Sequence, residues 1–132
     1  MAEVIQLGWT RIQTRTGRYE YQFQGVGPTV RNGAYLDARD YQFLVMDEEG
    51  WLYKIPVRMA RAAIAEIESR ASTLPASERE TAEKLTPLRI AEAQLRAGLE
   101  LFRPKRNAPY GELDAIFAVD AARWRELAAG AK

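Results

Sequence analysis

Apolar and polar residues alternate through much of the first half of the chain. The segment YEYQFQ (19–24) places three aromatic residues on one side of a strand and polar residues on the other, and the turn-forming string RTGR (15–18) precedes it. Residues 5–9 alternate in the same way, and a break in the pattern indicates a bulge at Gly8 or Thr10. These features predict a hairpin around residues 15–18.

A second hairpin is indicated by a residue pair that favours a tight turn. Asn32-Gly33 is typical of a type I′ turn, because both residues tolerate positive φ. The preceding stretch, residues 25–33, is rich in turn formers. We therefore expect only short strands beside the turn, over residues 29–31 and 34–36.

Two longer alternating segments, residues 41–46 and 51–57, enclose the turn sequence DEEG (47–50). Apolar residues also occupy the second face of these strands, so we expect this hairpin to lie centrally, with both faces partly covered. Pro56 is expected to close its last strand. Together the hairpins predict an antiparallel meander of about five strands.

The second half carries apolar residues at helical spacing, and we expect helices over residues 58–72, 78–85, 87–103 and 112–129. Ser77 and Glu80 have the spacing of a capping box. Thr86-Pro87 should separate the second helix from the third, because proline fits the first position of a helix but not its interior. A single kinked helix is the alternative. Residues 103–111 are expected to form a loop.

The expected helix over residues 87–103 has two apolar strips. The first should face the core and comprises Leu88, Ala91, Leu95, Leu99 and Phe102. The second comprises Ile90, Ala93, Ala97 and Leu101. We favour burial of the second strip inside the domain, although it could meet a partner, so a homodimer stays open.

Composition divides the chain near Val57. Nine of the thirteen aromatic residues lie in 1–57, and eighteen of the twenty-one alanines lie in 58–132. Aromatic residues favour strands and alanine favours helices. We expect one α+β domain over residues 1–132, with three to four helices packed on one face of the meander. The side chains expected to be largely buried are Trp9, Tyr21, Phe23, Phe43, Trp51 and Leu95.

The residue inventory argues against several chemistries. Cysteine and histidine are absent, which removes disulfides, thiolate nucleophiles, Cys/His zinc sites and an imidazole base. The three serines lie within residues 69–77, where helix capping explains them. No signal peptide or long apolar span is evident, so we expect a cytoplasmic protein that avoids membranes. We expect no cofactor, no metal and no catalytic residue.

Carboxylates are the conventional acid–base groups that remain. Asp37 and Asp40 flank a turn, and residues 47–49 crowd another. Such pairs could bind a metal or move protons. We interpret both clusters as solvated turns, since neither has the ligand ladder of a calcium loop. A carboxylate- or metal-dependent enzyme is our third hypothesis.

Arginines lie among the aromatic residues of the first half, a combination that could bind single-stranded nucleic acid. The favoured alternative is that the aromatic face is the core side, covered by the helices. A basic loop lies beside Tyr110 in the second half. The candidate partner-binding residues are Arg11, Arg15, Arg18, Arg31, Arg39, Arg103, Lys105, Arg106 and Tyr110.

These observations favour a small non-catalytic interaction protein that binds and blocks or modulates a macromolecular partner. Phage or mobile-element inhibitors of host defence complexes are one such class. A protein partner is preferred, because a net charge of +1 leaves little long-range attraction for a polyanion. A nucleic-acid-binding accessory protein, using the β-half arginines and the 103–106 loop, is the alternative.

Overall fold

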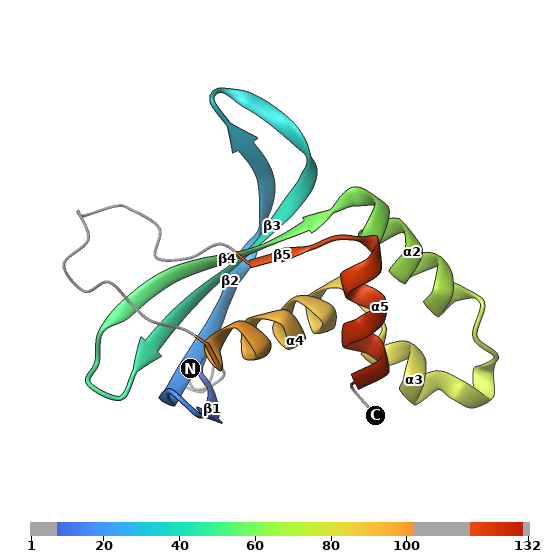
Figure 1. Cartoon of the computed structure of the whole chain (residues 1–132). Coiled ribbons are helices and arrows are strands. Elements are labelled where there is room, and N and C mark those ends of the chain that lie inside the picture. The colour runs from blue at the N-terminus through green and yellow to red at the C-terminus, as the bar shows by residue number, and fades with distance from the viewer. Residues whose placement is uncertain (1–7, 102–116, 131–132) are drawn as a thin grey trace, which may run out of the picture.

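The computed structural model describes residues 8–101 and 117–130, and it has the α+β architecture expected from the sequence (Figure 1). Its sheet has the order β1-β2-β3-β4-β5, with antiparallel pairing except between β4 and β5, which run parallel. The strands are β1 (Thr10–Thr14), β2 (Gly17–Arg31), β3 (Ala34–Asp47), β4 (Leu52–Ala60) and β5 (Phe117–Val119). The helices are α2 (Arg61–Ser72), the 3₁₀ turn η1 (Ala76–Glu78), α3 (Arg79–Lys84), α4 (Pro87–Leu99) and α5 (Ala121–Gly130).

The core lies between one face of the sheet and the helices. Cross-strand pairing brings Tyr21 opposite Val45, and Val45 opposite Tyr53, and all three side chains are buried. The helices cover this face with Ile67, Ile90, Leu95, Leu99 and Trp124. The aromatic face of β2 is therefore largely the core side, and burial of its apolar area stabilises the sheet against the helices.

Three of the six side chains expected to be buried are buried: Tyr21, Phe43 and Leu95. The expectation is wrong for Trp9, Phe23 and Trp51, which are 36%, 37% and 49% exposed. Trp9 precedes β1, and Trp51 belongs to the turn between β3 and β4. Phe23 lies beside a register shift where β2 leaves the covered part of the sheet. The alternating pattern shows that these residues are apolar, but it does not show how far each one lies from the helices.

β4 ends later than expected, and α2 begins later as a result. Pro56 does not end β4, which continues to Ala60 and therefore delays α2 to Arg61. Since β5 pairs with β4 only at Val57–Met59, Pro56 has a described neighbouring strand on one side, and its missing N–H is tolerated there.

The helix expected over residues 112–129 is replaced in the described part by β5 and the shorter α5. The Asp120 carboxylate accepts a hydrogen bond from the Arg123 backbone N–H (2.7 Å), which caps the new helix. β5 packs closely on α4, because a Cβ at Gly98 would overlap the ring of Phe117. Residues 112–116 lie outside the described residues.

The Thr86-Pro87 break separates two helices, as expected. Thr86 Oγ1 accepts a hydrogen bond from the Arg89 backbone N–H (3.2 Å), and Pro87 takes the first helical position of α4. The capping box expected at Ser77 and Glu80 does not form, because η1 occupies residues 76–78. Within the described residues, no helix is long and apolar enough to cross a membrane.

Candidate interaction surface

The most prominent surface feature is a projecting hairpin formed by residues 25–39, called the arm here. β2 and β3 continue as a pair beyond the part of the sheet that the helices cover (Figure 1). Asn32 and Gly33 form the tip with φ values of 52° and 79°, as a type I′ turn requires. Register shifts at Phe23/Gly25 and Pro28/Val30 interrupt the ladder. Such bulges bend a hairpin out of its sheet.

The base of the arm is fixed by a buried polar cluster. Thr29 Oγ1 donates a hydrogen bond to Asp40 Oδ1 (2.7 Å), and Arg58 Nε donates to the same oxygen (3.0 Å). Thr29 is fully buried and Asp40 nearly so. Because hydrogen bonds to a charged carboxylate are stronger than those between neutral groups, this cluster ties β2, β3 and β4 together where the arm leaves the sheet.

Apolar side chains on the arm are exposed. Tyr35 is 77% exposed and Val30, its cross-strand partner, 47% exposed. Val26 and Leu36 are also exposed. Val26, Tyr35 and Leu36 line a shallow hollow of about 320 Å³. The same hollow is also lined by Pro28, Ala38 and Arg39, and by Arg61 of α2. Grouped exposed apolar side chains on a projecting element are typical of an interaction site.

The charges around this surface are mainly positive. Arg31 at the tip and Arg39 near the base are exposed, and no described carboxylate lies within ion-pair distance of either. Asp37 is paired with Arg61, whose Nε lies 3.3 Å from the carboxylate. The arm therefore combines an apolar centre with two cationic flanks.

Arg11 and Arg18 lie at the opposite end of the sheet. In the β1–β2 register, Arg11 pairs with Glu20 and Gln13 with Arg18. Both arginines line a hollow of about 460 Å³ together with Glu20, Met46 and Glu48. The alternation of acidic and basic groups there resembles an ordinary solvated sheet face more than a phosphate site.

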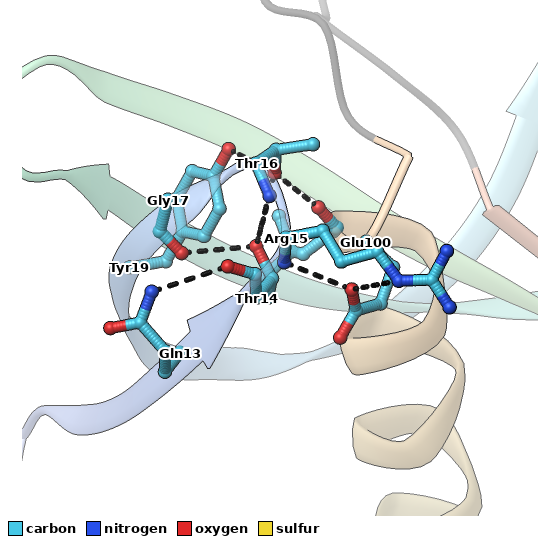
Figure 2. Close-up of polar contacts among 8 residues, drawn as sticks. Gln13, Thr14, Arg15, Thr16, Gly17, Tyr19 and Glu100 are labelled. Atoms are coloured by element: carbon cyan, nitrogen blue, oxygen red, sulfur yellow. Dashed lines mark hydrogen bonds and ion pairs between the residues drawn. The ribbon is translucent and has the colours of Figure 1, made fainter.

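Arg15 belongs to a turn that is attached to α4 (Figure 2). Its backbone N–H donates to Glu100 Oε1 (3.0 Å), and its guanidinium Nε lies 3.8 Å from the same oxygen. The neighbouring Thr16 hydroxyl donates to the Leu99 carbonyl (2.8 Å) and lies 2.9 Å from Tyr19 Oη. These contacts satisfy a carbonyl at the end of the helix and hold the β1–β2 turn against it.

The candidate arginines are thus divided among three places. Arg11 and Arg18 share the uncovered sheet face, Arg15 lies at the end of α4, and Arg31 and Arg39 lie on the arm. Arg103, Lys105, Arg106 and Tyr110 lie outside the described residues. Sequence reasoning missed the exposed apolar side chains of the arm. Their signal was the apolar residues on both sides of Asn32-Gly33, which the interspersed Gly25, Gly27 and Pro28 concealed.

The expectation of a solvated turn at Asp37 and Asp40 is wrong, because both residues lie within β3 and Asp40 is buried. The carboxylates proposed as alternative chemical groups have structural partners. Asp47 is buried, its Oδ1 accepts hydrogen bonds from the Glu49 and Trp51 backbone N–H groups, and its Oδ2 accepts one from the Tyr53 hydroxyl. Asp40 is used at the arm base, as described above. In residues 8–101 and 117–130, no three carboxylates gather closely enough to hold a metal ion.

Two tyrosines have perturbed hydroxyl groups. Burial is the main cause that raises the pKa of Tyr21 and of Tyr41 above the ordinary value of 10.0. Both phenols are therefore weaker acids than a tyrosine in water, and ionisation near neutral pH is disfavoured.

Comparisons with known protein families, with curated proteins and with solved structures find no match to this chain.

Proposed function

We propose that this protein acts without catalysis, by binding a protein partner through the arm and so blocking or modulating that partner. The observation that carries the proposal is the exposed apolar group Val26, Val30, Tyr35 and Leu36 on a hairpin of fixed direction. Leaving these side chains in water forgoes the favourable burial that a partner surface would provide. Their position beyond the helices makes them accessible to a large molecule.

The charge pattern indicates the chemistry of the partner. Arg31 and Arg39 flank the apolar centre, and arginine is among the residues that most often anchor protein interfaces. A complementary partner surface would have an apolar pocket for Tyr35 and acidic groups at its rim. Tyr35 is the single ring in this group, and Val26, Val30 and Leu36 offer no further ring on which successive bases could stack, so the same surface suits a protein better than a single strand of nucleic acid.

Docking through side chains is favoured over addition of a strand. β1 pairs with β2 only up to Tyr21, so the outer edge of β2 from Gln22 to Arg31 has no described strand beside it. That edge contains Pro28, which lacks an N–H, and two register shifts. Proline and bulges are the devices by which proteins prevent edge-to-edge pairing.

Co-purification with matched variants tests the proposal. The tagged protein is compared with Val30→Ser/Tyr35→Ser and with the control Leu101→Ser, since Leu101 is as exposed as Tyr35 at 77% but lies at the end of α4. We expect a specific protein, identified by mass spectrometry, to be retained by the parent and the control and lost by the arm variant. Equal retention by all three, with thermal midpoints unchanged, would refute a role for the arm.

The nucleic-acid alternative makes a different prediction. If arginines neutralise phosphates, log K falls with log salt by ~0.9 per duplex phosphate or ~0.7 per single-strand phosphate. We expect oligonucleotides to bind weakly at low salt, and Arg31→Ala/Arg39→Ala to weaken the protein complex with a shallow salt dependence. Tight, salt-steep oligonucleotide binding would instead favour a nucleic-acid accessory protein.

A further inference from the structure

A third concave surface lies among α3, α4 and α5. Its floor is apolar and is formed by Leu85, Ile90, Ala93, Leu127 and Ala128. The hollow has a volume of about 490 Å³, within the range of sites that hold a small ligand or an anchoring side chain. In the second apolar strip of α4, Ile90 is buried in the core, whereas Ala93 is only half-buried and Leu101 is exposed, so this strip is only partly used for packing inside the domain.

Three cations and one carboxylate line the same hollow: Lys84, Arg89, Arg96 and Glu92. Arg89 donates to Glu92 Oε1 (3.0 Å), and the Tyr21 hydroxyl donates to Glu92 Oε2 (3.2 Å). Arg96 donates to the Tyr21 hydroxyl (3.1 Å), with its Cζ 5.8 Å from the ring centroid. The single negative charge is thus engaged by its neighbours.

The lining of the hollow therefore has an excess of positive charge. Arg89 offsets Glu92, whereas neither Lys84 nor Arg96 has an ion pair with a described carboxylate. Lys84 is exposed at the end of α3, and Arg96 is held in place by Tyr21. A ligand that fits both the floor and the rim must carry apolar groups together with negative charge.

We propose that this hollow, named the α3–α5 groove, binds an acidic peptide segment that carries a large apolar side chain. The apolar side chain would lie on Leu85, Ile90 and Leu127, and the acidic groups would pair with Lys84 and Arg96. The helix-lined shape suits a short amphipathic segment of a protein. The arm of a second copy does not fit, because Arg31 and Arg39 would meet the same cations.

The groove is independent of the arm. It is lined by α3, α4 and α5, whereas the arm belongs to β2 and β3 and extends away from these helices (Figure 1). The protein would therefore contact two surfaces at once, either on one partner or on two. Failure of one site leaves the other standing, since neither shares a residue with the other.

The test uses the full chain and a fluorescein-labelled acidic octapeptide with a central Leu-Phe pair, followed by fluorescence polarisation. The control peptides replace Leu-Phe by Ser-Ser or replace every acidic residue by lysine. We expect binding only of the acidic peptide with its apolar pair. Lys84→Glu should weaken it by at least ~5-fold, because an attraction becomes a repulsion. Lys54→Glu, an exposed lysine on β4, is the matched control and should leave it unchanged.

Two further measurements separate the alternatives. Ala93→Leu should reduce binding by filling the groove while the thermal midpoint stays high, and Val30→Ser/Tyr35→Ser should have no effect on the peptide. If Lys84→Glu and Lys54→Glu weaken binding equally, the peptide is held by nonspecific charge attraction, and the proposal is overturned. Binding of decanoate with no binding of the acidic peptide would also overturn it, by making the groove a site for an amphiphilic carboxylate.

Discussion

Phe43 is a core residue whose ring packs against two other aromatic rings. The side chain is 1% exposed. Its ring meets Tyr21 edge-on at a centroid distance of 5.8 Å and Phe23 at 5.5 Å. Aromatic pairs at such separations contribute beyond the area that they bury. Phe23 lies next to it in the register but is 37% exposed, so the two positions form a natural comparison.

Phe43→Ala should lower the free energy of unfolding by ~3–5 kcal/mol, because it leaves a cavity in a packed core. Phe23→Ala should cost less, since part of its ring is already in water. Urea denaturation measures both losses, and an unchanged m-value would show that the unfolded state is unaffected. A midpoint that Phe43→Ala does not move would mean that the buried face of the sheet has been misassigned.

The carboxylates of residues 47–49 have different roles despite being adjacent. Asp47→Ala should lower the free energy of unfolding by ~1–3 kcal/mol, because it leaves the Trp51 N–H and the Tyr53 hydroxyl without this acceptor.

The combined variant Asp47→Asn/Glu48→Gln/Glu49→Gln should leave partner binding intact, since the sequence and the turn contacts give these residues no binding role. If the triple variant folds and binds the partner but loses its biological function, the result would favour a carboxylate-dependent enzyme. Circular dichroism and the co-purification assay provide the readouts.

At the scale of elements, most local signals were predicted well, although the Ser77–Glu80 capping box does not form, and long-range contacts were not predicted. The β1–β2 turn, the Asn32-Gly33 turn and the Thr86-Pro87 break each depend on a few adjacent residues, and all three are present. The lengths of β2 and β3 depend on cross-strand pairing, which the sequence of one strand does not contain. β5 was mistaken for helix because its three residues pair in parallel with β4, a contact between distant segments.

The pairing of α2 with α5 provides a pH-sensitive contact between two elements. Trp124 Nε1 donates to Glu66 Oε1 (2.9 Å), and Arg125 reaches both carboxylate oxygens at 2.8 Å. The hydrogen bond from Trp124, followed by that from Arg125, lowers the pKa of Glu66 below its ordinary value of 4.5. A lowered folded-state pKa means that the stabilisation is present above pH 4.5 and is lost as the pH falls through the lower value.

Glu66→Gln should therefore lower the thermal midpoint near neutral pH, and the difference from the parent should disappear in acid. Glutamine keeps an oxygen acceptor for Trp124, so the comparison isolates the charge. Thermal melts between pH 7 and about pH 3, followed by Trp fluorescence, provide the measurement. A difference that stays constant across this range would show that the charge of Glu66 contributes nothing.

At the scale of the whole molecule, the fold class could be predicted but the candidate surface could not. The shift from aromatic to alanine-rich sequence predicts a sheet followed by helices, and the structure has that arrangement. Arg31 and Arg39 were chosen for their charge, and both lie on the arm. The apolar residues around them were hidden, because the turn formers Gly25, Gly27 and Pro28 interrupt the apolar pattern of this stretch. Only the positions of the helices show that nothing described covers them.

Site-specific photocrosslinking most directly tests the central claim that the arm binds a protein. A photoreactive phenylalanine analogue replaces Tyr35 in one variant and Leu101 in another, two equally exposed positions. Each variant is irradiated in cells and its adducts are identified by mass spectrometry. We predict a single major protein adduct at position 35 that is absent at position 101. An adduct at position 101 alone, or only nucleic acid attached at position 35, would contradict the account.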